Sequence, residues 1–156
     1  MASTIGLLVG GCTNDNPPTD DELMAIFLAH EDDFHDIHEI IRNEAIAEDA
    51  YYDVEFDSLN DQRFRKGDYR QSLDSLLNEI NCNVVRGYGP GHNTIYFLYY
   101  STLGGTSKKI LYDRSLSGKV QITEGRKLND ICRECGGDTL LYKHIKGDWY
   151  IELNRD

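Results

Sequence analysis

Three histidines lie close together in the first third of the chain: His30, His35 and His38. Glu39 follows His35 by four residues, and side chains three or four residues apart share one face of a helix. Imidazole and carboxylate groups are ligands of zinc and copper, so His35, His38 and Glu39 form a candidate metal site, with His30 as a further ligand. The alternative is a solvated acidic helix face, in which His30 packs on the apolar side of the helix.

Three cysteines in the second half of the chain raise the question of a disulfide. Cys132 and Cys135 have the C-x-x-C spacing of a redox pair or of half a zinc site, but the sequence has no second C-x-x-C and no surrounding βαβ pattern. In an oxidising compartment Cys82 would pair with Cys132 or with Cys135, and a disulfide typically adds about 2–4 kcal/mol of stability. Three thiols without a role are the alternative.

The sequence contains no recognisable nucleophile elbow or phosphate loop. A G-x-S-x-G motif is absent. The glycine-rich segment 87–93 leads into a strand pattern rather than a helix, and Pro90 lacks the backbone donor that a phosphate loop needs. We therefore expect a non-catalytic protein without a cofactor, and a hydrolase with an unrecognised site is the enzymatic alternative.

Acidic residues are concentrated at the start of the chain. The 156 residues carry a net charge of -11. Residues 1–61 hold 16 acidic residues and one basic residue, for a charge of −15, whereas residues 62–156 carry +4. Nucleic-acid binding needs a basic footprint, so we do not expect it. A basic protein partner is expected at an acidic face, and a purely solubilising face is the alternative. The face consists of Glu31, Asp32, Asp33, Asp36 and Glu39.

Two amphipathic helices are predicted to carry the acidic and histidine residues. Thr19 and Glu22 have the spacing of a capping box, and apolar residues at spacings of three and four predict a helix from there to about Glu48. A second helix is predicted to begin after Asp68, which is suited to be its N-cap. Residues 51–56 fit either a short strand or an irregular segment.

The second half of the chain is predicted to form strands. Strand patterns cover residues 82–86, 94–102 and 108–113, and a closing hairpin covers residues 140–153. Residues 128–135 fit a helical turn or a strand, and a short strand is expected at residues 120–123. Helices followed by strands indicate an α+β fold, with two N-terminal amphipathic helices packed on a C-terminal antiparallel β-sheet.

A short apolar run near the N-terminus ends at a cysteine. Val9-Gly10-Gly11-Cys12 resembles the end of a bacterial lipoprotein signal, in which small residues precede the cysteine that is cleaved and lipidated. The resemblance implies that Cys12 is a lipid-bearing N-terminus. Thr13, rather than Asp, follows the cysteine, which by the same resemblance favours the outer membrane. A frayed apolar tail is the alternative.

This resemblance divides the chain into three parts. Residues 1–12 are a truncated signal-like segment, since no Lys or Arg precedes Cys12 and the apolar run covers only residues 5–9. Residues 13–21 are expected to be a flexible tether. Residues 22–156 are expected to form one α+β domain.

The closing hairpin also resembles a group of small, uncharacterised bacterial lipoproteins. These proteins end in a Tyr-x-His-Ile-x-Gly-x-Trp-Tyr stretch, which residues 142–150 match, and they open with a helix similar to residues 23–34. The resemblance implies an α+β fold and an envelope location, here an outer-membrane lipoprotein facing the periplasm. Together with the acidic face it favours an immunity protein, or an inhibitor of a basic toxin or cell-wall hydrolase. A metal-binding envelope protein that uses the histidines is the second hypothesis.

Overall fold

Among the described residues, one six-stranded antiparallel sheet forms the centre of the fold, with the strand order β1-β2-β3-β4-β6-β5. The computed structural model describes residues 16–44, 49–53, 69–88, 93–116, 125–135 and 137–155. The strands are β1 (Asp49–Asp53), β2 (Val84–Tyr88), β3 (Thr94–Ser101), β4 (Ser107–Asp113), β5 (Thr139–Lys146) and β6 (Trp149–Arg155). The predicted α+β class is confirmed. The predicted strand at residues 120–123 lies outside the described residues.

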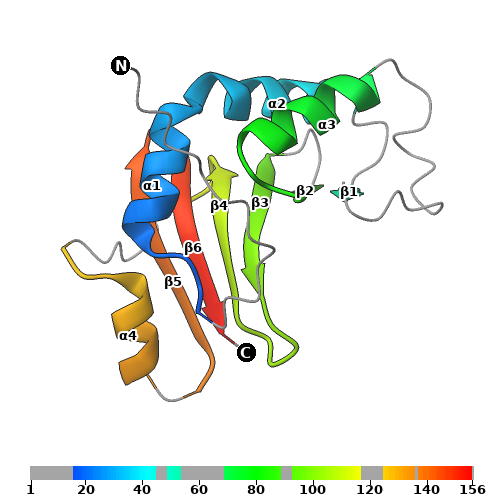
Figure 1. Ribbon diagram of the computed structural model, residues 1–156. Helices are drawn as coiled ribbons and strands as arrows, with labels where there is room; N and C mark the ends of the chain where they lie inside the picture. The colour runs from blue at the N-terminus through cyan, green and yellow to red at the C-terminus, as the bar shows by residue number, and fades with distance from the viewer. Residues whose placement is uncertain are drawn as a thin grey trace, which may run out of the picture.

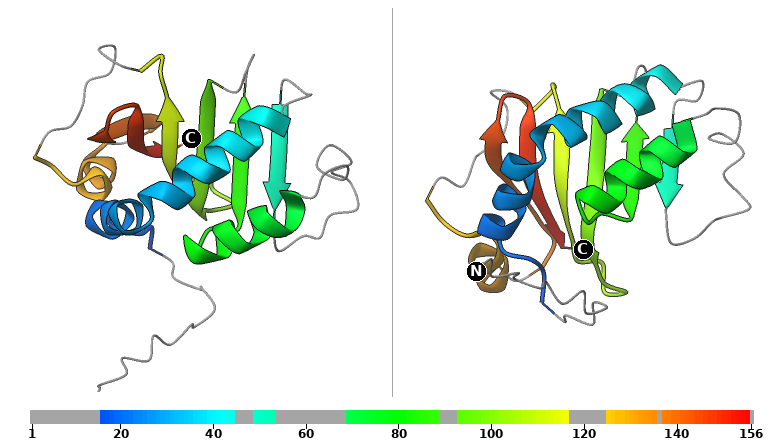
Figure 2. Two further views of the ribbon diagram at one scale, coloured as in Figure 1. Left: turned by 90° about the horizontal axis from the view of Figure 1, so that it is seen from above. Right: turned by 45° about the horizontal axis from the view of Figure 1, so that its top comes forward.

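In the part of the chain that the structure describes, three helices cover one face of the sheet, and a fourth lies beside its β5 edge (Figures 1 and 2). The helices are α1 (Asp20–Ala29), α2 (Glu31–Glu44), α3 (Tyr69–Glu79) and α4 (Leu128–Glu134). Helix α1 rises from the end of the molecule that holds the C-terminus and the β3–β4 turn to α2 at the opposite end (Figure 1). No helix among the described residues is long and apolar enough to cross a membrane.

The prediction of one long first helix is wrong, because the chain breaks at His30. Helix α1 begins with the predicted capping box and ends at Ala29, and the N–H of His30 donates to the carbonyls of Ile26 and Phe27. Helix α2 then starts with three acidic residues in its first turn. Carboxylates are favoured there by the positive end of the helix macrodipole, so this acidic run is a helix-start signal.

An aromatic cluster joins the helices to the sheet. Phe34 of α2 is fully buried, and its ring centroid lies 5.2 Å from Phe27, 4.8 Å from Phe97 and 5.7 Å from Trp149. Tyr112 of β4 lies 5.1 Å from Trp149 in an edge-on arrangement. Such tilted and edge-on pairs each add about 0.5–1.5 kcal/mol beyond the burial of their area. The cluster therefore fixes α2 to the sheet and sets which side of α2 faces solvent.

Candidate functional site

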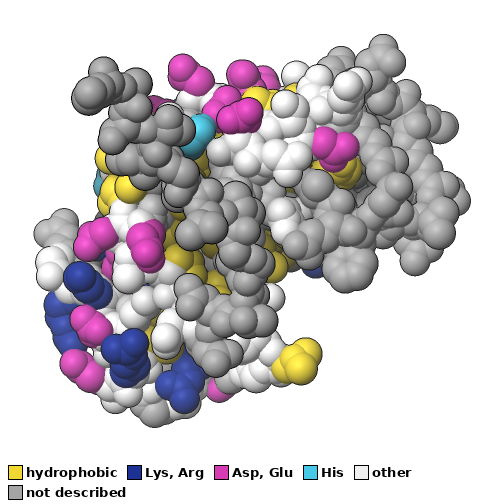
Figure 3. All heavy atoms as spheres, viewed as in Figure 1, with side chains coloured by type: hydrophobic (Ala, Val, Ile, Leu, Met, Phe, Trp, Pro, Cys, Tyr) yellow, Lys and Arg dark blue, Asp and Glu magenta, His cyan; other side chains and the backbone are white. Residues whose placement is uncertain are grey.

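The five carboxylates predicted to form an acidic face all lie on α2. Phe34, Ile37 and Ile41 of this helix are buried, and the helical period therefore turns the opposite side to solvent. In Figure 3, Asp and Glu side chains gather over α2 along the top of the view. The five are the exposed Asp32, Asp36 and Glu39 and the partly buried Glu31 and Asp33.

Glu31 is neutralised from within the molecule. Both of its carboxylate oxygens accept hydrogen bonds from Lys146 Nζ of β5, each at 2.8 Å. This hydrogen bond and the lysine charge lower the pKa of Glu31, and His35 lies 3.8 Å away on the same helix. Glu31 therefore connects α2 to the end of the closing hairpin, and the charge of Lys146 offsets its own.

Two more carboxylates of the face have local partners on the helix. Asp33 Oδ2 lies 2.9 Å from His30 Nδ1, and Glu39 Oε1 lies 3.4 Å from Arg42 Nη1. Exposed pairs of this kind contribute about 0–1 kcal/mol. The charge of Arg42 partly offsets that of Glu39, and the ring of His30 occupies one carboxylate oxygen of Asp33.

Asp32 and Asp36 are the unpaired members of the face. Both are exposed, and neither forms an ion pair with another described residue. They stand four positions apart on one helix, where like charges destabilise an isolated helix by about 0.2–0.5 kcal/mol. The uncompensated charge of the acidic face is therefore focused on these two positions.

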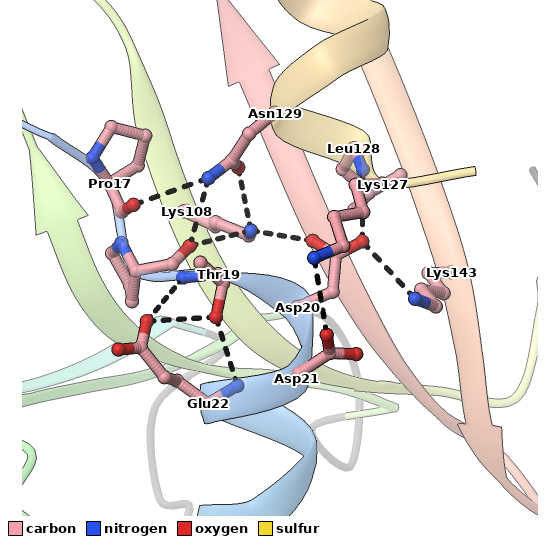
Figure 4. Close-up of polar contacts among 11 residues, drawn as sticks. Pro17, Thr19, Asp20, Asp21, Glu22, Lys108, Lys127, Leu128, Asn129 and Lys143 are labelled. Carbon is pink, nitrogen blue, oxygen red and sulfur yellow. Dashed lines mark hydrogen bonds and ion pairs between the residues drawn. The ribbon is translucent and has the colours of Figure 1, made fainter.

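A buried hub fastens the start of the domain to the sheet; we use this name for Asp20, Lys108 and Asn129. Lys108 of β4 is 0% exposed. Its ammonium group donates to three acceptors: Pro18 O at 2.7 Å, Asp20 Oδ1 at 2.6 Å and Asn129 Oδ1 at 2.7 Å. Figure 4 shows Lys108 between Asp20 and Asn129. Three acceptors use all three N–H donors of an ammonium group. Lys108 is therefore a buried structural cation without a free lone pair for catalysis.

The other groups of the buried hub are satisfied as well. Asp20 Oδ2 accepts from the N–H of Leu128 at 2.9 Å and from Lys143 Nζ at 3.3 Å. Burial alone would raise the pKa of Asp20, but the hydrogen bonds from Lys108 and Leu128 and the two lysine charges lower it overall. Asn129 Nδ2 donates to Pro17 O at 3.2 Å. The buried hub thus joins residues 17–20 to β4, α4 and β5.

The buried hub was not among the predicted sites, although the sequence contains a signal for it. Side chains in a strand alternate between two faces, and Lys108, Ile110 and Tyr112 all occupy the inward positions of β4. A lysine in phase with buried apolar residues must find an internal acceptor. The predicted flexible tether over residues 13–21 is correspondingly wrong for residues 17–20, which the buried hub holds in place.

Two cavities flank residues 16–18, which we call the strap. Neither cavity contains a nucleophile with a general base among its described lining residues, and Glu22, the carboxylate of the first cavity, already accepts from Thr19. The first, of about 430 Å³, is lined by Asn16, Pro18, Glu22, Leu23, Ile26, Asn81, Asn83, Leu98, Tyr99 and Tyr100. The second, of about 230 Å³, is lined by Asn16, Pro17, Tyr100, Thr106, Asn129, Cys132, Arg133, Leu153 and Arg155.

The structure does not bring the predicted metal ligands together. His38 is 7% exposed, and its ring centroid lies 4.3 Å from that of Tyr112 in the core. Its Nδ1 is 3.9 Å from Glu39 Oε1, whereas His35 pairs at 3.8 Å with Glu31. Within the described ranges, no group of three or more His, Cys, Asp or Glu side chains is arranged to hold a metal ion. The geometry therefore gives the metal hypothesis no support.

The burial of His38 predicts a loss of stability in mild acid. Burial lowers the pKa of His38 below the ordinary range of a histidine, although the charge of Glu39 opposes the shift. The unfolded chain therefore binds this proton more readily. The full free energy of unfolding is present at pH values above the pKa of His38 in the unfolded chain. It decreases as the pH falls from there through the lower pKa of His38 in the folded protein, by at most about 1.4 kcal/mol per pH unit.

Urea denaturation of wild type and His38→Gln at about pH 7.5 and about pH 5.5 measures this effect, because other side chains titrate equally in both proteins. We expect wild type to lose more stability on acidification than His38→Gln does. Equal losses in the two proteins would show that His38 is not a buried neutral imidazole.

Cys82, Cys132 and Cys135 form no disulfide with one another in the described part of the chain, so neither pairing considered for Cys82 is formed. Cys82 is buried and its Sγ donates to Val84 O at 3.3 Å, at the start of β2. Cys132 is buried in α4, and Cys135 is the C-cap residue of that helix. Cys12 lies outside the described residues.

A comparison with protein families gives a match over almost the whole chain. The family model described as a domain of unknown function, DUF4948, matches residues 16–156. The matched segment begins at the strap and includes every described helix and strand. No curated protein and no solved structure matches the chain.

Proposed function

The chain belongs to the DUF4948 family, and we propose that it is a non-catalytic, membrane-tethered envelope protein that binds a basic protein through the acidic face of α2. The observation that carries the proposal is the pair of unpaired, exposed carboxylates at Asp32 and Asp36. Repulsion between these two carboxylates destabilises α2, and no ion pair with another described residue compensates for it. A cationic partner protein would be attracted by both carboxylates, and this attraction would raise the rate of association.

The rigidity of α2 supports a binding role for its acidic face. Phe34 anchors the helix in the aromatic cluster, and the Glu31–Lys146 pair fastens its first turn to β5. Asp32 and Asp36 are therefore presented on a fixed helix rather than on a loop. A preformed surface avoids the entropy of ordering a segment on binding.

The proposed location rests on Cys12 and the residues before it. Lipidation at Cys12 would attach the lipid four residues before the strap, where the buried hub holds Pro17 and Pro18. Such a protein would be held at the outer membrane, facing the periplasm. An immunity protein, or an inhibitor of a basic toxin or of a cell-wall hydrolase, fits this combination of a short tether and an acidic binding face.

The proposal is tested by capture from an envelope extract. The immobilised full chain is expected to retain a basic protein at low salt and to release it at high salt, because exposed charge pairs are screened by ions. Bound proteins are identified by mass spectrometry. Retention of no basic protein at low salt would contradict the proposal.

A further inference from the structure

We infer that Cys132 and Cys135 are an oxidisable pair, which forms a disulfide at the end of α4 when the protein reaches an oxidising compartment. The structure shows both residues as thiols. The chemistry of the pair follows from the geometry of α4, whereas its oxidation in cells rests on the proposed envelope location. The pair is a modification site separate from the acidic face of α2, and its co-reactant is a thiol oxidant that carries a disulfide.

The end of α4 holds the two cysteines at a separation that a disulfide can bridge. The N–H of Cys135 donates to Ile131 O at 3.0 Å, so the helical turn continues up to Cys135. Residues three apart in an α-helix have Cα atoms about 5 Å apart, as the rise and radius of the helix require. Disulfides join Cα atoms that are about 4.4–6.8 Å apart. Side chains three positions apart also share one face of a helix, so the two thiols are neighbours.

Arg155 of β6 fixes this turn from outside the helix. Its Nη1 donates to the carbonyl of Cys132 at 3.2 Å and to the carbonyl of Cys135 at 3.4 Å. The guanidinium group therefore caps the C-terminal carbonyls of α4, where the helix dipole favours a positive charge. These hydrogen bonds involve neither sulfur atom, so a disulfide can form without breaking them.

The sheet keeps Cys82 away from this pair. Cys82 lies two residues before β2, and its Sγ donates to Val84 O at 3.3 Å and to Leu98 O at 3.5 Å. Helix α4 contacts β5 and β6, and the strand order places β3 and β4 between β2 and β6. Three strand spacings amount to about 14 Å, roughly twice the Cα separation that a disulfide tolerates. Among the described cysteines, Cys132 and Cys135 are therefore the pair that can form a disulfide.

The exposure of the two residues sets the order of the reaction. Cys135 is partly exposed, whereas Cys132 is 8% exposed and lines the smaller cavity beside the strap. The Cys135 thiolate attacks the disulfide of the oxidant, which forms a mixed disulfide and releases one thiol. Cys132 then attacks the Cys135 sulfur, and the second thiol of the oxidant leaves. Two protons and two electrons thus pass from the protein to the oxidant, whose disulfide becomes two thiols.

Oxidation of the pair stabilises the helix that completes the buried hub. Helix α4 has seven residues and no side-chain hydrogen bond at its N-cap, and helices this short are marginal without tertiary contacts. It nevertheless provides Asn129 and the N–H of Leu128 to the buried hub. A disulfide across its last turn restricts the unfolded segment. The oxidised protein is therefore expected to hold α4, and with it the attachment of the strap, more firmly than the reduced protein does.

Equilibration with glutathione tests the pair. The full chain with Cys12→Ser is incubated with reduced and oxidised glutathione, both folded in buffer and unfolded in urea, and the remaining thiols are blocked with N-ethylmaleimide. Trypsin cleaves between the two cysteines, after Arg133, so their disulfide joins peptides 128–133 and 134–143 in mass spectrometry. Cys132→Ser and Cys135→Ser are the matched controls, because neither variant can form this disulfide.

We expect the linked peptides to be the main oxidised product, with an equilibrium constant against glutathione about tenfold higher in the folded chain than in urea. Thermodynamic linkage then requires the oxidised protein to unfold at a higher urea concentration than the reduced protein. In the two single-serine controls, glutathione forms only a mixed disulfide with the remaining cysteine of the pair, and we expect no such rise in the urea midpoint.

Three outcomes would overturn the inference. These are linkage of peptide 71–86, which contains Cys82, glutathione adducts in place of the internal disulfide, and equal equilibrium constants in the folded and the unfolded chain. The cellular location is a separate measurement, namely whether Cys12→Ser protein leaves the membrane fraction. Failure of the cysteine pair and failure of the proposed envelope location are therefore distinguishable.

Discussion

Lys108→Met is expected to lower the free energy of unfolding by about 3–5 kcal/mol, the usual cost of removing one partner from a buried ion pair. Methionine fills a similar volume but donates no hydrogen bond. Asp20 would keep its buried charge with the weaker donor Lys143 at 3.3 Å, and the acceptors on Pro18 and Asn129 would lose a donor. Each unsatisfied acceptor costs about 1–3 kcal/mol.

Lys127→Met is the matched control for this variant, because Lys127 is exposed and pairs at 3.5 Å with the exposed Asp21. Its loss is expected to change stability by no more than about 1 kcal/mol. Urea unfolding, followed by the fluorescence of Trp149, measures both variants. Similar effects of the two substitutions would show that the hub lysine is neither buried nor essential to the fold.

Phe34→Ala is expected to lower the free energy of unfolding by about 3–5 kcal/mol, as for other large-to-small changes in packed cores. The ring of Phe34 lies within 6 Å of three other aromatic rings, those of Phe27, Phe97 and Trp149. Its removal leaves a cavity between α1, α2 and the sheet. The acidic face of α2 would lose its fixed position along with this anchor.

Two further variants calibrate that result. Phe34→Leu retains most of the buried volume and is expected to cost roughly half as much or less. Leu28→Ala, at a position 59% exposed, is expected to change stability by less than about 0.5 kcal/mol. If Phe34→Ala were as mild as Leu28→Ala in urea unfolding, the aromatic cluster would not be what holds α2 to the sheet.

Local patterns were sufficient to predict most of the fold. The Thr19–Glu22 capping box, the apolar period of α3 and the strand patterns on either side of Gly147 each depend on neighbours within a few residues. The break at His30 was missed because apolar residues continue in phase through it, from Phe27 to Phe34. The three acidic residues in the first turn of α2 mark the start of a new helix, but the apolar spacing alone does not show this start.

The candidate site depended on pairings across the fold, which sequence spacing does not reveal. Glu31 is neutralised by Lys146, 115 positions later in the chain, and Lys108 reaches Asp20 across 88 positions. Sequence spacing identified five acidic positions but not which of them stay unpaired. It likewise placed His38 beside Glu39 without showing that its ring packs against Tyr112.

The central claim is that Asp32 and Asp36 bind a basic protein, and a charge-matched capture experiment tests it most directly. The wild type is compared at low salt with Asp32→Asn/Asp36→Asn and with Glu79→Gln/Asp138→Asn, which removes two exposed carboxylates that are not on α2. We predict about tenfold weaker capture of a basic envelope protein by the α2 variant and wild-type capture by the control. Equal capture by all three proteins would contradict the claim, and equal losses in both variants would show that net charge, not the acidic face of α2, holds the partner.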